Sequence, residues 1–376
     1  MGISLGRIED GSNPNEGRSK INSAFETLEI VFSGSAVGSY WTSGSSGNYS
    51  VKSLNDSDTD ATGDYSLAYG LNNIASGISS YADGSGTTAV GNYSRSHGVF
   101  TVANGVGSVS EGAYTIANGF LSRAEGIQTT TYGDYSSAQG RQTIASGNVS
   151  HSEGYLTNAY GIASHSQGYA TNAYGDFSNS EGESTEAWGQ SSRSEGFETY
   201  SYGDYSHSEG KNTSASGDSS HSEGYLTSTF GLSSHAEGNG TSAYGDSSHS
   251  EGRLTISSGE SSHAEGTSTQ ANGVGSHTSG QFNIANASYS QILGGSGNTI
   301  DTSAEGSVIL GASGITAEQA YTAYVSNLNI NISQTISSSG DTAGKVGNLT
   351  WDDDYLYIKT NRDGGKWGRV AIDYNF

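Results

Sequence analysis

The sequence of 376 residues contains no cysteine and a single proline, Pro14. Without cysteine there is no disulfide framework, and the redox compartment cannot be inferred. The scarcity of proline, with glycines that do not fall at every third position, excludes a collagen triple helix. No apolar run approaches the roughly 20 residues of a transmembrane helix, and we expect neither a signal peptide nor membrane insertion.

Basic residues are also scarce, with 15 Lys and Arg against 38 Asp and Glu, a formal net charge of −23. This balance argues against nucleic acid and anionic membranes as partners, because both attract basic patches. Hydrophobic residues make up 32% of the chain, and few of them are branched aliphatics. Such a composition is typical of disorder unless a regular repeat compensates for the missing core.

Glycine supplies that regularity, because it occupies every seventh position from Gly63 to Gly280. Four residues before these glycines, Ser and Thr alternate, and two residues before them stands Ala, Ser or Thr with few exceptions. The true unit is therefore 14 residues long, as in Ser150-His-Ser-Glu-Gly-Tyr-Leu-Thr-Asn-Ala-Tyr-Gly-Ile-Ala163. A coiled coil is excluded, because its a and d positions must be apolar and each glycine would cost about 1 kcal/mol of helix propensity.

The spacing of small residues at alternate positions before a glycine predicts two short strands per 14 residues. We expect an all-β parallel solenoid with Ser, Thr and Ala inside each turn, and with hydroxyl groups hydrogen-bonded along the stack of turns. From Gly63 to Gly280 this gives a roll on the order of 75 Å long. Its interior buries little apolar surface, so we expect three rolls to pack side by side as a homotrimer.

Units such as Ser220-His-Ser-Glu-Gly-Tyr-Leu-Thr-Ser-Thr-Phe-Gly231 resemble the 14-residue head repeats of trimeric autotransporter adhesins. The resemblance covers about 63–280 and extends loosely to Gly311. It implies a left-handed parallel β-roll, a trimer, and a trimer axis that faces the half-turn carrying His and Glu. The other half-turn is the more apolar one and favours the opposite orientation, so both stay open. Where those heads place Val and Ile this chain places His and Glu, and their signal peptide and membrane barrel are not evident.

The segments on either side of the repeat predict an attachment segment over 1–62 and a β-rich tip over 312–376, with the roll over 63–311. Residues 13–28 predict a short helix with Asn13 as N-cap and Pro14 in its first turn. Its apolar stripe is Ile21, Phe25 and Leu28, and the segment is similar to N-terminal stretches of phage tail fibres. At the other end, residues 344–372 predict a β-hairpin around 361–365, similar to terminal modules of phage virion proteins.

His and Glu recur in one phase of the repeat, two residues apart. We predict that they form a structural ladder within or between subunits, since an active site needs one constellation and not a series. Repeated ion binding is the alternative, but we expect no metal site and no cofactor. The pairs are His151 and Glu153, His207 and Glu209, His221 and Glu223, His235 and Glu237, His249 and Glu251, and His263 and Glu265.

Aromatic residues form a second column, one residue before the glycine of the other half-turn. They predict either packing, in an interface or as a cross-turn ladder, or an exposed face that stacks on sugar rings; we treat these as mutually exclusive. The column consists of Tyr132, Tyr160, Tyr174, Trp188, Tyr202, Phe230 and Tyr244.

Acidic residues that directly follow a repeat glycine are predicted to shape turns. They are Asp134, Asp176, Asp204, Asp218 and Asp246.

Together these features predict a non-enzymatic, homotrimeric virion fibre of a phage tail or head. Its N-terminus would bind other virion, baseplate or capsid proteins, and its surface a host glycan or protein. A structural spacer or decoration protein and a cell-surface adhesin are the alternatives, and a polysaccharide depolymerase is the least favoured.

Overall fold

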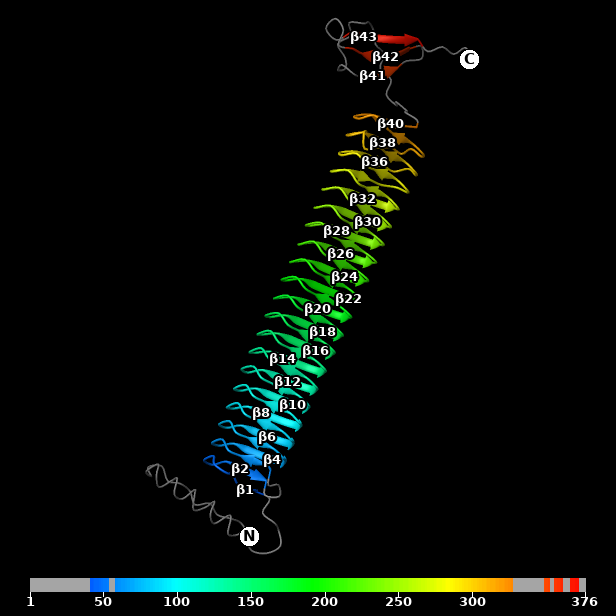
Figure 1. Ribbon diagram of the computed structural model, residues 1–376. Helices are drawn as coiled ribbons and strands as arrows, with labels where there is room; N and C mark the ends of the chain where they lie inside the picture. Colours follow the sequence, from blue (N-terminus) through cyan, green and yellow to red (C-terminus); the bar gives the residue numbers. More distant parts are fainter. Residues whose placement is uncertain (1–40, 54–57, 327–347, 352–354, 361–365, 372–376) are drawn as a thin grey trace.

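The structure, a computed structural model, describes residues 41–53, 58–326, 348–351, 355–360 and 366–371. The described residues up to 326 form the long rod of stacked turns in Figure 1. They consist of strands and turns, and no helix occurs among them. The predicted attachment helix with Ile21, Phe25 and Leu28 lies outside the described residues, as does the predicted hairpin turn over 361–365.

Two parallel sheets run along the rod, and each turn contributes one strand to both. The strands of sheet A carry even numbers; β1 (Trp41–Ser43) pairs with β2 in the antiparallel sense at its N-terminal edge. The strands of sheet A are β2 (Val51–Ser53), β4 (Leu67–Leu71), β6 (Tyr81–Ser85), β8 (Arg95–Val99), β10 (Val109–Ala113), β12 (Arg123–Ile127), β14 (Ser137–Arg141), β16 (His151–Tyr155), β18 (His165–Tyr169), β20 (Asn179–Glu183), β22 (Arg193–Phe197), β24 (His207–Lys211), β26 (His221–Tyr225), β28 (His235–Asn239), β30 (His249–Arg253), β32 (His263–Thr267), β34 (His277–Thr278), β36 (Gln291–Leu293), β38 (Val308–Leu310) and β40 (Ala323–Val325).

Sheet B is built from two-residue strands with odd numbers. They are β3 (Asp60–Ala61), β5 (Ile74–Ala75), β7 (Thr88–Ala89), β9 (Val102–Ala103), β11 (Ile116–Ala117), β13 (Thr130–Thr131), β15 (Ile144–Ala145), β17 (Asn158–Ala159), β19 (Asn172–Ala173), β21 (Glu186–Ala187), β23 (Tyr200–Ser201), β25 (Ser214–Ala215), β27 (Ser228–Thr229), β29 (Ser242–Ala243), β31 (Ile256–Ser257), β33 (Gln270–Ala271), β35 (Ile284–Ala285), β37 (Thr299–Ile300) and β39 (Thr316–Ala317).

Each strand pairs in parallel with the strand one turn later. His151 lies opposite His165 in sheet A, and Asn158 lies opposite Asn172 in sheet B. The prediction of an all-β parallel solenoid with two short strands per 14 residues is thereby confirmed, over about 19 turns. Parallel pairing runs from β2 to β40, so the coil extends beyond both ends of the predicted repeat range 63–311.

The interior of each turn holds small side chains, as predicted. Thr157 and Ala159 of one half-turn are fully buried, and Ser150 and Ser152 of the other are at most 1% exposed. Because the two sheets face each other across one layer of such residues, a larger side chain would have to push the sheets apart. The interior is therefore too narrow to form a hydrophobic core of the usual kind.

Interior hydroxyl groups that form hydrogen bonds mostly do so within a turn, and others, such as those of Thr143 and Ser150, have no partner among the described residues. The prediction of hydroxyl bonds along the stack is therefore wrong for them. The hydroxyls of Ser152 and Thr157 lie 2.8 Å apart, and Ser164 donates to the carbonyl oxygen of Gly161 at 2.7 Å. The reason is distance, because equivalent hydroxyl groups in successive turns are roughly 4.8 Å apart, beyond the reach of a hydrogen bond. Asn73 is an exception, since its side-chain oxygen accepts a hydrogen bond from Thr87 in the next turn.

The repeat glycines occupy two different positions, only one of which is the predicted turn. Gly161 begins a corner after β17, whereas Gly154 lies inside β16 with a φ of +128°. In both positions the next turn approaches closely. A Cβ atom would lie 2.0 Å from the carbonyl oxygen of Gly175 at the first position, and 2.1 Å from that of Gly168 at the second. Glycine is thus required by the close stacking of the turns.

Two residues after most repeat glycines the chain turns a corner in the left-handed conformation. The φ angles there are +58° at Tyr205, +56° at Ser184 and +55° at Leu226, although none of these residues is glycine. The conformation costs an L-residue roughly 1–2 kcal/mol. A hydrogen bond to the previous turn offsets part of that cost, as where the N–H of Tyr205 donates to the carbonyl oxygen of Gln190 at 2.8 Å.

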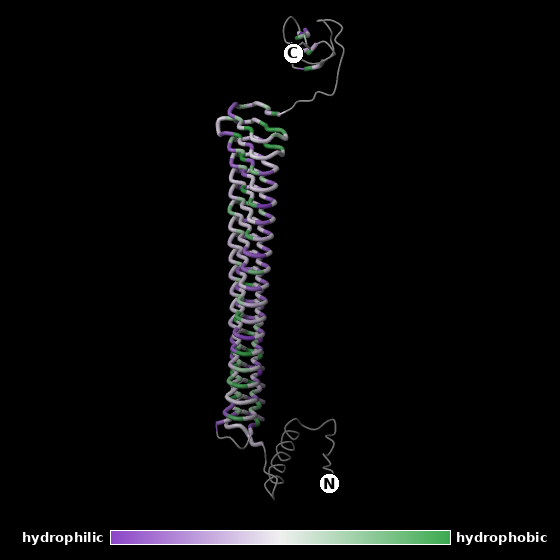
Figure 2. The backbone as a smooth tube through the Cα atoms, turned by 90° about the vertical axis from the view of Figure 1, so that its right-hand side faces the viewer, coloured by the Kyte–Doolittle hydropathy of each residue, from purple (hydrophilic) through white to green (hydrophobic). Residues whose placement is uncertain are grey.

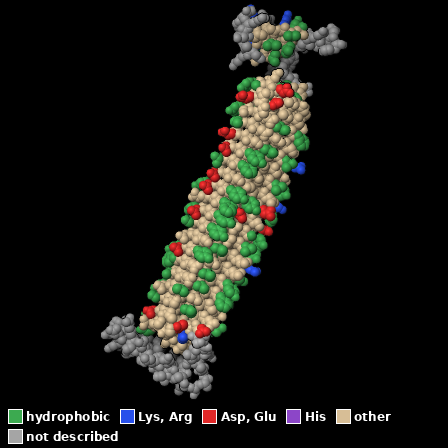
Figure 3. Space-filling view, viewed as in Figure 1, with side chains coloured by type: hydrophobic (Ala, Val, Ile, Leu, Met, Phe, Trp, Pro, Cys, Tyr) green, Lys and Arg blue, Asp and Glu red, His purple; other side chains and the backbone are tan. Residues whose placement is uncertain are grey.

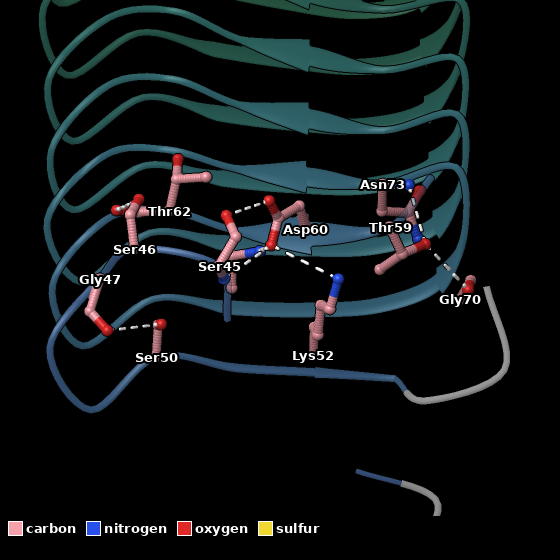
Figure 4. Close-up of polar contacts among 11 residues, drawn as sticks. Ser45, Ser46, Gly47, Ser50, Lys52, Thr59, Asp60, Thr62, Gly70 and Asn73 are labelled. Atoms are coloured by element: carbon pink, nitrogen blue, oxygen red, sulfur yellow. Dashed lines mark hydrogen bonds and ion pairs between the residues drawn. The ribbon is translucent and has the colours of Figure 1, made fainter. Parts of the chain in front are cut away.

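Polar contacts close the N-terminal end of the coil (Figure 4). The carboxylate of Asp60 accepts hydrogen bonds from the N–H group, at 3.0 Å, and the hydroxyl group of Ser45. Its Oδ1 also lies 3.6 Å from Nζ of Lys52. Partial burial raises the pKa of Asp60, but these donors outweigh it and hold the pKa below its usual value. A charged Asp60 therefore links the first turns of the rod.

The C-terminal turns are longer and hold an aliphatic core. Strand partners there are 15 residues apart between Ile284 and Thr299, and 17 apart between Thr299 and Thr316. The extra residues make room for larger side chains inside. The C-terminal aliphatic core consists of Ala285, Ala287, Ile292, Ile300, Ala304, Ile309, Ala312 and Ala317.

A separate three-stranded antiparallel sheet follows, formed by β41 (Leu349–Trp351), β42 (Tyr355–Lys359) and β43 (Trp367–Ala371). The pairing of β42 with β43 confirms the predicted hairpin. Tyr357 and Trp367 are its buried hydrophobic residues, 6% and 5% exposed.

Candidate functional site

Outward-facing side chains form straight rows, because residues one repeat apart lie directly above one another. On sheet A the first and third residues of each strand face outward, and on sheet B the first residue and the one after the strand do so. Figure 3 shows hydrophobic side chains gathered in lines along the rod. Any surface site on this molecule is therefore repeated along the axis.

The first outward row of sheet A contains a continuous stack of imidazole rings. Successive ring centroids lie 4.7–4.9 Å apart, and the planes are parallel to within 12°. We call this stack the His ladder; it consists of His207, His221, His235, His249, His263 and His277. Asn179 and Arg193 separate it from a shorter stack of His151 and His165, whose centroids are 5.1 Å apart.

The predicted partners of these histidines lie beside them. Nε2 of His207 is 3.4 Å from Oε2 of Glu209, and the corresponding distance from His221 to Glu223 is 3.6 Å. It is 3.8 Å both for His235 with Glu237 and for His249 with Glu251. At the end of the ladder the partner changes, because Glu265 lies 3.6 Å from His277, one turn away. In the shorter stack, His151 lies 3.4 Å from Glu153.

The Nε2 atoms of the His ladder are enclosed but make no hydrogen bond with any described residue, although the rings are about one third exposed. Two successive histidines and the glutamate between them bring three donor atoms within 4.8 Å of one another. This arrangement occurs four times along the ladder.

Burial lowers the pKa of His221, His235 and His263 below the ordinary value of 6.5. The neighbouring histidines of the ladder lower it further, since a charged imidazole disfavours a second one beside it. The adjacent glutamates act in the opposite direction and do not cancel the effect. These three rings are therefore neutral near pH 7.

We expect the metal-free coil to lose stability as the pH falls below about 6.5. In this range the unfolded chain binds protons that the folded His221, His235 and His263 do not, so the free energy of unfolding decreases as the pH falls. Thermal unfolding from pH 7.5 to 5, with EDTA present, measures the effect. Replacing the three histidines with Asn, the residue at position 179 of the same row, should remove it. Identical pH profiles for the two proteins would contradict the assignment.

The aromatic column lies on the outer face of sheet B and is both stacked and exposed. Tyr160 and Tyr174 stack at 5.1 Å, Tyr174 and Trp188 at 3.9 Å, and Trp188 and Tyr202 at 6.4 Å. Farther along, Phe230 stacks on Tyr244 at 4.8 Å. The rings nevertheless remain accessible, with Tyr160 at 41% and Tyr202 at 48% exposure. Cross-turn stacking and exposure therefore coexist, and the expectation that they exclude each other is wrong.

Serine interrupts the aromatic column at two places. Ser146 lies between Tyr132 and Tyr160, and Ser216 lies between Tyr202 and Phe230. With one ring missing, the flanking rings are two turns apart, about 10 Å. The column is thus divided into an isolated Tyr132, a block of four rings and a block of two.

Glu186 lies within the block of four rings and accepts a hydrogen bond from Nε1 of Trp188 at 2.9 Å. Burial, and then the charge of Glu186, raises the pKa of the Tyr174 and Tyr202 hydroxyl groups. Both groups therefore remain protonated at neutral pH and can donate hydrogen bonds. The site combines ring surfaces, hydroxyl donors and one carboxylate.

The aspartates after the repeat glycines stabilise corners, as predicted. Asp134 accepts the backbone N–H of Phe120 at 2.8 Å, and Asp176 accepts that of Ile162 at 2.8 Å. Asp204, Asp218 and Asp246 make the same bond to the residue one turn earlier, at 2.8–3.0 Å. The role of these carboxylates is therefore to stabilise the turns.

Sequence reasoning missed an apolar row on sheet B, which we call the β-branched row. It is formed by the first residues of β5 to β15: Ile74, Thr88, Val102, Ile116, Thr130 and Ile144. Beyond β15 the first residues of the strands are mostly polar, beginning with Asn158 and Asn172, with Tyr200, Ile256 and Ile284 as exceptions. Figure 2 shows hydrophobic residues more often in the turns near the ends of the coil than in its middle. The spacing was visible in the sequence, but only the strand boundaries show that these side chains face outward.

No protein-family model matches the chain, and no curated protein matches it. Among the residues that the structure describes, no helix is long and apolar enough to cross a membrane.

Proposed function

We propose that the chain forms a homotrimeric virion fibre of a phage tail or head, which projects from the particle and binds a glycan on the host surface. The observation that carries the proposal is the aromatic column, most of whose rings remain exposed on the surface of a rod of about 19 turns. Backbone hydrogen bonds between all successive turns make such a rod stiff, so it can hold a binding surface away from a particle. The N-terminus would bind other virion proteins.

The β-branched row supports the proposed trimer. It places six apolar or β-branched side chains in line on the outer face of β5 to β15, and Ile74 is 42% exposed in the single chain. Three copies packed through this row would remove a continuous apolar stripe from water. Because the next residues of the row, Asn158, Asn172 and Glu186, are polar, the contact would end there, and the aromatic rings of the later turns would remain free.

The gap at Ser216 is the proposed glycan site. The rings of Tyr202 and Phe230 flank it at a separation of two turns, so a ring placed midway would lie about 4.8 Å from each, within stacking range. Ser214 lies beside the gap, with its hydroxyl 3.5 Å from that of Ser216. A pyranose ring has apolar faces and hydroxyl groups at its rim, and it matches this combination. The net charge of −23 favours a neutral sugar over an acidic one.

The test is to fill the gap with an aromatic side chain like those in the rest of the column. Ser216→Tyr adds a ring between Tyr202 and Phe230 without disturbing the backbone, and we expect binding to host cells to fall about fivefold or more. Each lost ring contact is worth about 0.5–1.5 kcal/mol, and two are lost. Ser258→Tyr is the matched control, because Asn272 follows it and no second ring closes a gap there. Binding is measured by flow cytometry with labelled protein.

The same preparations test the trimer. Light scattering should give about 116 kDa, three times the 38.7 kDa of one chain, for the wild type and for both variants. Replacing Val102 and Ile116 with Glu should yield the monomer. If Ser216→Tyr binds cells as the wild type does, the gap is not the site.

A purely structural spacer is the second candidate, and one observation favours it. Within the block from Tyr160 to Tyr202 each ring covers the faces of its neighbours, so the inner rings present mainly their edges. If the protein is only a spacer, replacing Tyr174, Trp188 and Tyr202 with Ala should leave cell binding unchanged. Loss of binding in this variant, with the trimer intact, favours the fibre that binds glycan.

A further inference from the structure

We propose that the His ladder binds divalent transition-metal ions, each held by two successive histidines and the glutamate between them. This site goes beyond the proposed attachment function and departs from the prediction of a purely structural ladder. The four overlapping groups are His207, Glu209 and His221; His221, Glu223 and His235; His235, Glu237 and His249; and His249, Glu251 and His263.

The donor atoms of each group are close enough to converge on one ion. They lie within 4.8 Å of one another, whereas donors about 2.1 Å from a tetrahedral ion are separated by about 3.4 Å. Binding therefore requires each pair of donors to approach by up to about 1.4 Å. The parallel imidazoles must also rotate towards each other, because their lone pairs point in the same direction. Side chains about one third exposed on the outer face of a sheet have room for this movement.

An independent observation points to a missing ligand. Nε2 of each of these histidines is enclosed, with no hydrogen bond to any described residue. The nearest carboxylate oxygens remain 3.4–3.8 Å away, beyond the usual range of a hydrogen bond. Unsatisfied buried nitrogen atoms are uncommon in native proteins. Here they recur at every turn of the ladder, and a shared metal ion would satisfy two of them at once.

The chemistry of the donors selects the class of ion. Two imidazole nitrogens and one carboxylate oxygen suit Zn²⁺, Ni²⁺ and Cu²⁺, whereas Ca²⁺ and Mg²⁺ prefer sets made of oxygen alone. Three protein ligands leave at least one position for water. The net charge of −23 adds a general attraction for cations.

Neighbouring groups share a histidine, which limits the number of ions. His221, His235 and His249 each belong to two groups, so the five histidines from 207 to 263 can fill no more than two complete groups at once. Every group contains His221 or His249. Replacing these two residues therefore removes all four groups, whereas replacing His207 and His263 leaves the two middle groups, which share His235.

The experiment compares these two double variants by isothermal titration with Ni²⁺ at pH 7.5. We expect H221N/H249N to bind two fewer ions per chain than the wild type, and H207N/H263N to bind one fewer. Both variants lose two imidazoles and gain the Asn that occurs naturally at position 179. Absorption spectra with Co²⁺ provide a second readout, because the intensity of the visible bands reports tetrahedral coordination.

Two results would overturn the proposal. One is equal ion binding by the wild type and H221N/H249N. The other is an equal loss in the two variants, since this would mean that imidazoles bind singly and not in groups. Circular dichroism establishes that each variant retains the coil, and a titration with Ca²⁺ in place of Ni²⁺ measures the binding due to carboxylates alone.

Discussion

Replacing Gly182 with alanine should destabilise the coil by about 3 kcal/mol or more. Gly182 has a φ of +121°, and a Cβ atom there would lie 2.1 Å from the carbonyl oxygen of Gly196. Strained backbone costs of order 1–3 kcal/mol, and forcing an extra carbon into a packed interior costs about as much again. The oxygen is part of the backbone of the next turn, so it cannot move away without breaking the stack. Urea unfolding, followed by far-ultraviolet circular dichroism, measures the loss.

The matched control lies two residues further along the same turn. Ser184 has a φ of +56°, in the left-handed region that glycine adopts without penalty. Ser184→Gly should therefore leave the coil as stable as the wild type or stabilise it by up to about 1 kcal/mol. If Gly182→Ala unfolds at the same urea concentration as the wild type, the glycines are not required by the contact between turns.

Truncating Ile300 to alanine should loosen the C-terminal turns while the rest of the rod stays folded. Ile300 is fully buried in the C-terminal aliphatic core, and such a truncation costs about 2–5 kcal/mol. In a repeat protein each turn contacts only its neighbours, so the damage remains local. Hydrogen exchange should show faster exchange of the amides of residues 284–325 and unchanged protection over 150–270.

Leu310 provides the comparison, because it belongs to the same turns but is 44% exposed. Leu310→Ala should leave exchange over 284–325 close to that of the wild type. Uniform loss of protection along the whole rod in Ile300→Ala would show that the coil unfolds as one unit and that the aliphatic core is not a local cap.

The repeat unit of the fold could be predicted from sequence because its constraints are strict. Only small residues fit inside the turn, so Thr157 and Ala159 reveal the inward positions by their size. Only glycine permits the contact between turns, so Gly154 and Gly161 mark the period. The turn aspartates could be predicted in the same way, because they directly follow repeat glycines. The side chain of Asp176, for example, accepts a hydrogen bond from the backbone of the preceding turn.

The left-handed corners could not be predicted, because no residue type marks them. Tyr205, Ser184, Leu226 and Glu198 all adopt this conformation. The hydrogen bond to the preceding turn stabilises the corner through the backbone, so side chains as different as these occur there. The direction of the interior hydroxyl bonds was missed for a related reason, since it depends on how closely the two sheets face each other.

For the candidate sites, the sequence predicts which residues share a column, but it does not predict which atoms within a column are in contact. The phase of His235 and Glu237 was evident, yet the unsatisfied nitrogen atom appears only when ring and carboxylate are placed in space. The gap at Ser216 depends on a single missing ring in the aromatic column. That the gap matches the size of a sugar ring follows from the distance between turns, which the spacing of residues in the sequence does not provide.

The stacking of identical turns also makes the reach of this protein adjustable. Because residues 14 apart are equivalent in both sheets, as His221 and His235 are, a duplication or deletion of one repeat preserves every contact on either side of it. Each such event would change the length by about 4.8 Å. The distance between the two ends of the rod could thus be changed in regular increments of one repeat, by evolution or by protein engineering, without redesigning the sequence.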